Sequence, residues 1–288
     1  MISFFRVVLH IAFFLAVCFA APAASMTVSV ADAVPAQGSP LVVVVSTPEP
    51  VDNLAVVWKG VSWPMLKTAP GRYEALIGID LLASPGPESL VVEQVVKGAR
   101  TRHEETVRVV EKAFPVQRLT LPKRMTEFDN AMLLRIDKER RALADRFSRV
   151  TLPVLWTLPF LTPVDGYRPE NFGVRREING ELRMPHAAVD IRLPAGTPVR
   201  AIADGVVALA EEQFFGGKTV TIDHGGGVFS TYMHLQNYSV KEGLRVSRGE
   251  TIGAVGATGR ATGPHLHFAV RIPGGRIDPT LLFELTGK

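Results

Sequence analysis

The chain has 288 residues, 47% of them apolar and 21% charged, which is typical of a globular protein and excludes a disordered one. This length is enough for two modest domains, each with its own core. The formal net charge of +4 favours weak attraction to anionic envelope polymers. Lysines and arginines are nevertheless scattered without a dense basic run, so we expect no nucleic-acid partner.

Residues 1–23 have the layout of a secretory signal peptide. Arg6 precedes an apolar stretch over residues 7–20, and Ala21-Pro22-Ala23 offers small residues for cleavage. The apolar stretch is shorter than the ~20 residues of a spanning helix, so we expect no stable membrane insertion after cleavage. An uncleaved anchor is the alternative. The segment predicts an exported protein of the periplasm or cell envelope.

The chain contains a single cysteine, Cys18, inside this segment. Val17 stands where a lipoprotein attachment site requires a small residue, so lipidation is not expected. Cleavage beyond Cys18 leaves a mature protein without cysteine, which excludes disulfides and thiolate metal ligands. Any metal must then be held by histidine and carboxylate.

Residues 24–114 show the pattern of short strands. Residues 41–45 form a β-branched run, and polar and apolar residues alternate over residues 73–80. Proline and glycine separate such runs, as in Ser84-Pro85-Gly86-Pro87. The pattern predicts a small β-sandwich of the immunoglobulin-like kind. His103 stands among charged residues and is expected at the surface.

Residues 115–150 are predicted to form a connecting helix. Apolar residues recur at helical spacing over residues 122–147, and a charged face accompanies them. Pro122 suits the first turn of such a helix. We expect the helix to pack against one or both domains; a partner-binding role is the alternative.

Residues 151–288 return to short strands separated by many glycines, which predicts an antiparallel β-domain. Five of the seven histidines fall in it, at positions 186, 224, 234, 265 and 267. His265-Leu266-His267 begins a predicted strand, where side chains at i and i+2 point to the same face. Such a pair shares a metal or divides the work around one, unless both are surface residues.

A second group is His186-Ala187-Ala188-Val189-Asp190, expected as a loop that enters a strand near Asp190. Imidazole and carboxylate are suitable zinc ligands. The helical His-Glu-x-x-His signature is absent. His234 adds a further imidazole, whereas His224 precedes a glycine turn and is expected to be structural.

Taken together, His-x-x-x-Asp, Tyr-x-His-Leu and Thr-Gly-Pro-His-Leu-His-Phe, in this order, resemble the lysostaphin-type zinc metallopeptidase family of peptidoglycan endopeptidases. The resemblance covers roughly residues 159–283, and Phe172-Gly173-x-Arg175 is similar to the family's entry to the site. Ala188 stands where the family commonly has glycine, which removes no ligand.

The resemblance implies one Zn²⁺ per chain, bound by His186, Asp190 and His267. His234 and His265 would be the catalytic acid–base pair, in a groove of the β-domain. The implied activity is a zinc metalloendopeptidase that hydrolyses peptide cross-links of peptidoglycan through a zinc-activated water.

Tyr232 and Arg175 are expected to contact the substrate, a peptidoglycan peptide. No protein partner is indicated. The main alternative is a catalytically inactive relative that binds or activates other cell-wall hydrolases, and a third possibility is a peptidase of exported proteins. Every expected metal and base position is filled, which favours the enzyme.

Overall fold

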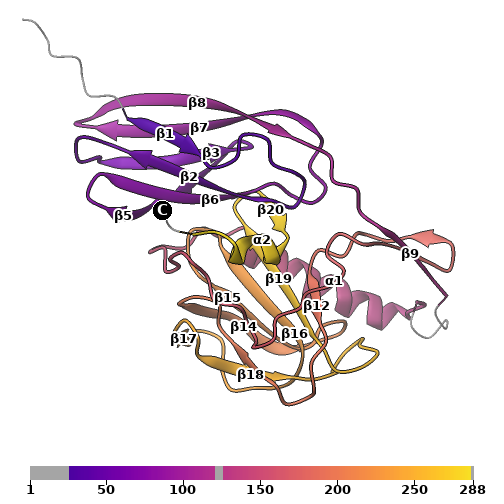
Figure 1. Ribbon diagram of the computed structural model, residues 1–288. Coiled ribbons are helices and arrows are strands. Elements are labelled where there is room, and N and C mark those ends of the chain that lie inside the picture. The colour runs from indigo at the N-terminus through magenta and orange to yellow at the C-terminus, as the bar shows by residue number, and fades with distance from the viewer. Residues whose placement is uncertain (1–25, 121–125, 287–288) are drawn as a thin grey trace, which may run out of the picture.

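The computed structural model describes residues 26–120 and 126–286 (Figure 1). The chain is mainly β, as predicted, with an N-terminal sandwich, one long helix and a larger C-terminal sheet. The predicted signal peptide, residues 1–23, lies outside the described residues. Within the described part of the chain, no helix has the length and hydropathy needed to cross a membrane.

The N-terminal sandwich consists of two four-stranded antiparallel sheets. The first has the order β1 (Thr27–Val30), β2 (Pro40–Ser46), β6 (Arg72–Gly78) and β5 (Leu66–Ala69). The second has the order β4 (Val61–Pro64), β3 (Asn53–Trp58), β7 (Gly86–Val96) and β8 (Ala99–Val109). This arrangement is the strand order of an immunoglobulin-like sandwich, which confirms the predicted fold.

Alternation along the strands explains this sandwich. Side chains at every second position of β2 and β6 face the second sheet, which supplies Val56, Trp58 and Val92 to the same core. All three are almost fully buried. His103 lies on β8 with its imidazole 2.7 Å from Glu105, and its side chain is 38% exposed, which fits the expected surface position.

The C-terminal domain is built on a sheet of nine strands. Its central path runs β12 (Val189–Ile191), β19 (Leu266–Ile272), β16 (Phe229–Tyr238), β15 (Gly217–Asp223), β14 (Gly205–Gln213) and β17 (Arg245–Val246). Alongside this path lie β13 (Pro198–Arg200), β18 (Thr251–Val255) and β20 (Gly275–Ile277). The pairings are antiparallel, as predicted for this half of the chain.

The long helix α1 spans Asn130–Phe147 and begins later than predicted. Asp129 has an extended backbone, and its side chain accepts a hydrogen bond from the Met132 N–H at 2.8 Å, which is the geometry of an N-cap. Pro122 lies outside the described residues. The start of the predicted connecting helix is instead strand β9 (Val116–Leu119), which pairs in parallel with β10 (Arg175–Ile178).

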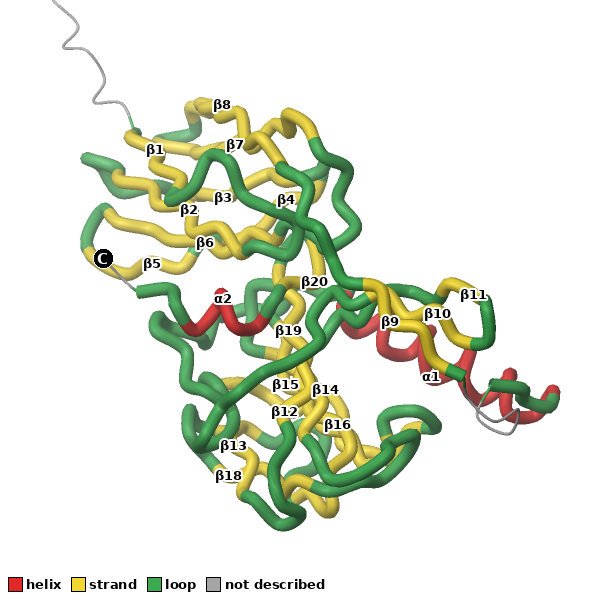
Figure 2. The backbone as a smooth tube through the Cα atoms, turned by 45° about the vertical axis from the view of Figure 1, so that its right-hand side comes forward, coloured by secondary structure: helices red, strands yellow, loops and turns green. Residues whose placement is uncertain are grey.

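Helix α1 packs on the C-terminal sheet. The ring of Phe147 lies 5.2 Å from that of Phe229, centroid to centroid, and Phe128, just before the helix, contacts Phe214 and Phe215. No residue of α1 is itself buried. Figure 2 shows the helix beside the small sheet of β9, β10 and β11 (Glu181–Leu182).

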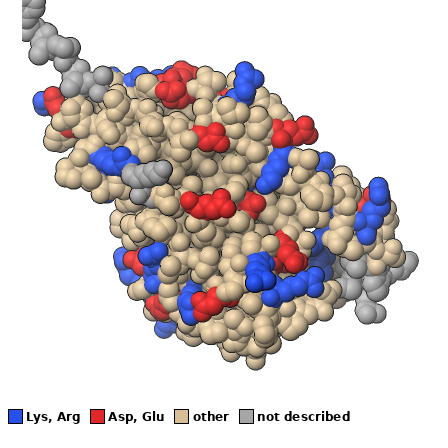
Figure 3. Space-filling model, viewed as in Figure 1, with Lys and Arg blue, Asp and Glu red and all other residues tan. Residues whose placement is uncertain are grey.

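The sandwich joins the C-terminal sheet at the β19–β20 hairpin. Asp80 forms a bidentate ion pair with Arg276, with N–O distances of 2.7 and 2.9 Å. The Gly78 N–H donates to the Pro273 carbonyl at 2.6 Å. The short helix α2 (Pro279–Phe283) follows this hairpin. Figure 3 shows basic and acidic side chains interspersed over one face of the molecule.

Candidate metal centre

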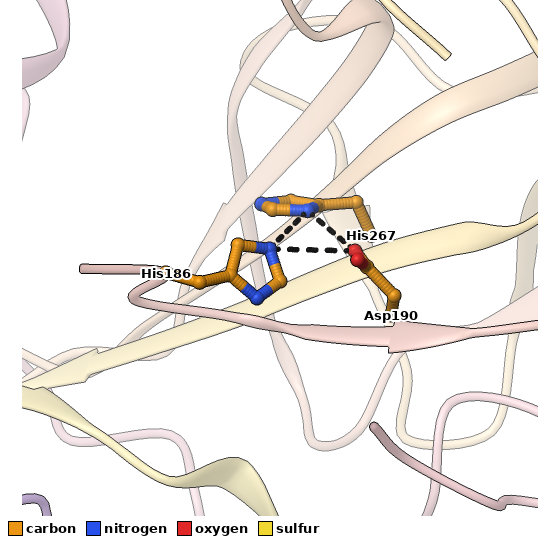
Figure 4. A group of neighbouring side chains, drawn as sticks. All are labelled: His186, Asp190 and His267. Carbon is orange, nitrogen blue, oxygen red and sulfur yellow. Dashed lines mark hydrogen bonds and ion pairs between the residues drawn. The ribbon is translucent and has the colours of Figure 1, made fainter. Parts of the chain in front are cut away.

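His186, Asp190 and His267 converge on one point of the C-terminal sheet (Figure 4). Asp190 on β12 is directly opposite His267 on β19 in an antiparallel pair, so the two side chains project from the same face. Asp190 Oδ1 lies 2.9 Å from His267 Nδ1. His186, in the loop before β12, brings its Nε2 to 3.1 Å from His267 Nδ1 and 3.4 Å from Asp190 Oδ1.

The tautomer of His186 is fixed by the backbone. Its Nδ1–H donates to the carbonyl of Asn171 at 2.9 Å, which leaves the Nε2 lone pair directed at the other two residues. Asn171 adopts a left-handed backbone conformation, with φ +70°. Its carbonyl thus acts as an outer support that orients the imidazole.

The electrostatics of the three residues suit a cation. Burial raises the pKa of Asp190, but hydrogen bonds with His186 and His267 outweigh that effect and hold the pKa well below the usual carboxyl range. Burial lowers the pKa of His267. Two ring nitrogens that face each other at 3.1 Å repel through their lone pairs unless a cation or a proton lies between them.

The donor set matches a divalent metal. The two nitrogens and the carboxylate oxygen lie within 4.8 Å of one another, and all three side chains are largely shielded from solvent. Two imidazoles and one carboxylate are a ligand set typical of catalytic zinc, which leaves a further position for water or substrate. The residues therefore fit the predicted metal.

Two further histidines flank the centre. The ring centroid of His234 lies 4.7 Å from that of His265 and 5.7 Å from that of His267. His265 Nε2 is 3.8 Å from Asp190 Oδ1. His234 Nδ1–H donates to the Thr258 carbonyl and His265 Nδ1–H to the Gly263 carbonyl, each at 2.8 Å. One loop, residues 258–263, therefore aims both Nε2 atoms at the site.

The backbone of His234 is strained, with φ +60°, a left-handed conformation that non-glycine residues rarely adopt. Its N–H leaves the strand ladder and donates to the Gly216 carbonyl at 2.7 Å. Burial, and then the neighbouring His267, lower the pKa of His234 to about 4. The imidazole is therefore neutral near pH 7 and able to accept a proton.

Tyr232 does not lie where the sequence predicts a substrate contact. The residue is fully buried beside Phe268. Its hydroxyl accepts a hydrogen bond from the Ile202 N–H at 3.1 Å and lies 3.0 Å from the Ser230 hydroxyl. The positive φ of His234 explains the error, because it breaks the alternation that would place residues 232 and 234 on one face. Tyr232 belongs to the core.

His224 is structural in this fold, as expected. It is fully buried, its Nδ1–H donates to the Asp204 carbonyl at 2.7 Å, and its Nε2 lies 2.8 Å from the Ser230 hydroxyl. Burial lowers the pKa of His224 to about 4. The neutral ring is a hydrogen-bonded part of the interior, away from the three converging residues.

Arg175 was expected to contact the substrate, but the structure places its neighbour Arg176 at the centre. Successive side chains of a strand point to opposite faces, and on β10 the Arg176 guanidinium lies 3.4 Å from Asp190 Oδ2. Arg175 is exposed. Arg176 was not among the site residues predicted from the sequence, and the only signal for it was its place next to Arg175.

A groove runs along the sheet from the metal centre. Met233 and Ala269 lie on the same face as His267, and Leu143 and Phe147 of α1 stand over them. The space between helix and sheet comprises two cavities of about 610 and 210 Å³ that share Leu143, Phe147, Met233 and Arg271. Helix α1 is therefore the wall of this groove.

Comparison with known proteins agrees with this geometry. Residues 184–279 match the description "Peptidase family M23". Over 143 residues the chain is 37% identical to the peptidoglycan DD-endopeptidase ShyA of Vibrio cholerae, which covers 49% of this chain and 31% of that protein. Over 94 residues it is 48% identical to the DD-carboxypeptidase/endopeptidase Mpg of Neisseria meningitidis, covering 33% of this chain and 22% of that protein.

The chain thus spans less than a third of the length of these two curated relatives. A solved structure matches far more completely. The crystal structure of a putative peptidase M23 from Pseudomonas aeruginosa is 33% identical, with a TM-score of 0.68, over 86% of this chain and 95% of that one. With the family's motif order and its converging ligand set in place, the chain belongs to peptidase family M23.

Proposed function

We propose that the protein is an exported zinc metalloendopeptidase that hydrolyses peptide cross-links of bacterial peptidoglycan. The observation that carries the proposal is the convergence of His186, Asp190 and His267, with two more imidazoles aimed at the same point. Relatives named as peptidoglycan endopeptidases support the substrate class. That substrate, in turn, supports a location in the periplasm or cell envelope.

His186, Asp190 and His267 would hold one zinc ion through Nε2, a carboxylate oxygen and Nδ1. Zinc in such a site is a Lewis acid that polarises a carbonyl group and makes water more acidic. The Asn171 carbonyl keeps His186 in the required tautomer. Arg176, against the outer oxygen of Asp190, helps to hold the carboxylate in its ionised form.

His234 and His265 would carry the proton transfers. Each imidazole donates its Nδ1–H to a carbonyl of the loop 258–263, so each presents Nε2 as the atom that can take a proton. One takes the proton of the attacking water, and the protonated ring can then release it to the leaving amine. The groove beside α1 would hold the extended peptide, with its scissile carbonyl at the metal centre.

The proposal is tested against the inactive-regulator alternative by purifying the mature protein and measuring its zinc content and its action on sacculi. About one zinc per chain and chelator-sensitive release of peptides support the enzyme. A protein that holds no zinc and releases nothing, yet stimulates another hydrolase, would favour the regulator. Cleavage of exported proteins alone would favour the third alternative.

A further inference from the structure

Arg176 contacts the metal centre from outside its ligand set, with its guanidinium 3.4 Å from the outer oxygen of Asp190. Arg183 follows β11, and its backbone N–H donates to the Arg176 carbonyl at 2.8 Å. The small β10–β11 hairpin therefore carries both residues. The hairpin thus carries two cations, one of which contacts Asp190.

Arg260 lies on the loop that orients the flanking histidines. It lies between Thr258 and Gly263, whose carbonyls receive the Nδ1–H groups of His234 and His265. The backbone N–H of Arg260 donates to the Phe215 carbonyl at 3.0 Å, and the Arg260 guanidinium lies over the Phe215 ring, 4.2 Å from its centroid. This stacking limits the freedom of the side chain before any ligand arrives.

The Arg260 guanidinium has no hydrogen bond or ion pair with any residue that the structure describes. Burial, and then the like charges of Arg176 and Arg183, lower the pKa of Arg260. Asp190 is committed to the metal centre and Glu181 pairs with Arg183 at 2.7 Å. A divalent metal would add to this positive charge, so an anionic group of a ligand would be attracted to this place.

We propose that Arg260 and Arg176 form a carboxylate-binding subsite beside the metal centre, which selects peptides with a free carboxylate close to the scissile bond. This inference rests on the proposed peptidase function. A guanidinium presents a planar fork of N–H donors that matches a carboxylate in two parallel hydrogen bonds. A substrate anchored in this way is held in one orientation against His234 and His265.

The test uses cross-linked peptides isolated from sacculi and the same peptides after conversion of their carboxylates to carboxamides. The zinc-loaded full chain digests both forms, and kcat/KM is measured by chromatography. We expect the unmodified peptide to be cleaved at least about tenfold more efficiently, since a charge-assisted hydrogen bond is lost with the carboxylate.

The variant Arg260→Met should bring the ratio of the two kcat/KM values close to one. Arg260→Lys, which keeps the charge but not the fork, should retain part of the preference. Arg245→Met is the matched control, because Arg245 is exposed on β17, at the other end of the sheet path from β12, and should leave the ratio unchanged. Zinc content and thermal stability are measured for every variant.

A second readout is peptide affinity for the chelator-treated protein, measured by calorimetry. The unmodified peptide should bind more tightly than the carboxamide form, and Arg260→Met should remove the difference. If the wild type cleaves both forms equally well, the subsite is rejected while the peptidase function stands. If neither form is cleaved, the peptidase function fails, and equal affinities for the two forms then reject the subsite as well.

Discussion

In the N-terminal sandwich, aliphatic side chains and Trp58 from both sheets fill the interior, and the buried carboxylate Glu74 is paired with Arg72 at 3.2 Å. The C-terminal sheet instead shields several imidazoles, among them the buried His186, His224 and His234. A buried imidazole destabilises a fold unless its ring atoms are hydrogen-bonded. The sandwich is thus organised for stability, whereas the C-terminal sheet accepts strain and buried polarity to arrange chemistry.

Within the C-terminal domain, the role of a histidine depends on where its ring nitrogens find partners. His224 has both ring nitrogens matched inside the protein, by Asp204 and Ser230. His186, His234 and His265 each have Nδ1 bound to a backbone carbonyl and Nε2 directed toward the centre. The same residue type therefore serves as structure in one place and as a candidate ligand or base in the other.

The largest effect should come from His267→Ala. Removing a ligand should lower zinc affinity by more than the about 10- to 100-fold typical of losing an outer-shell partner, and peptidase activity should fall to background. Metal analysis and digestion of sacculi measure both. His103→Ala in the sandwich is the control, and it should change neither value. A His267→Ala protein that still bound zinc and cleaved sacculi would show that the ligand set is wrong.

His234→Ala should separate proton transfer from metal binding. Loss of a general acid or base typically lowers kcat by about 100- to 10,000-fold, while zinc held by the other three side chains should remain largely bound. The measurement is kcat on a defined wall peptide beside zinc content. Near-normal kcat would leave His265 as the sole proton carrier, and full loss of zinc would make His234 a ligand instead.

His224 should make stability depend on pH. Its pKa is about 4 in the folded state against a model value of 6.5, so the unfolded chain binds the extra proton first. The neutral His224 ring therefore stabilises the fold fully above pH 6.5. This part of the free energy of unfolding, about 3 kcal/mol in total, is lost as pH falls from 6.5 toward 4. Denaturant unfolding at several pH values measures it. His224→Gln should be less stable at pH 7 but should show a flatter pH slope; an unchanged slope would contradict the assignment.

Asp80→Asn should have the smallest effect, because the Asp80–Arg276 pair joins the two regions at a partly exposed interface. Burial raises the pKa of Asp80, but the hydrogen bonds with Arg276 outweigh it and the net pKa is lowered. The pair therefore stabilises above about pH 4 and is lost below it, and its removal should cost about 1 kcal/mol. Peptidase activity should not change. A large loss of activity would indicate that the sandwich positions the groove.

Sequence patterns located the converging residues because those residues sit in short motifs whose local geometry is simple. His267 lies at the start of a strand and Asp190 in a short strand that follows a loop, as the predicted elements have them. Tyr232 was misplaced because the left-handed backbone of His234 cannot be seen in a strand pattern. Arg176 was missed because its contact with Asp190 joins strands β10 and β12, which are neighbours only in the folded chain.

In the sandwich and in helix α1, too, local sequence patterns predicted the elements, whereas long-range packing could not be predicted. Its alternation and turn residues predicted an immunoglobulin-like strand set, and the strand order confirms it. The start of α1 was predicted too early because the helical spacing continues backward through Phe128, whereas the Asp129 N-cap marks where the helix begins. That α1 forms a wall of the groove follows from long-range packing and has no signature in its own residues.

The most direct test of the account is a mass-resolved digest of purified peptidoglycan by the zinc-loaded mature protein, run beside chelator-treated protein. We expect cross-linked peptides to disappear and shorter peptides to accumulate only when zinc is present, and restored zinc to restore the cleavage. Intact cross-links after digestion by fully zinc-loaded protein, or equal cleavage after chelation, would contradict it.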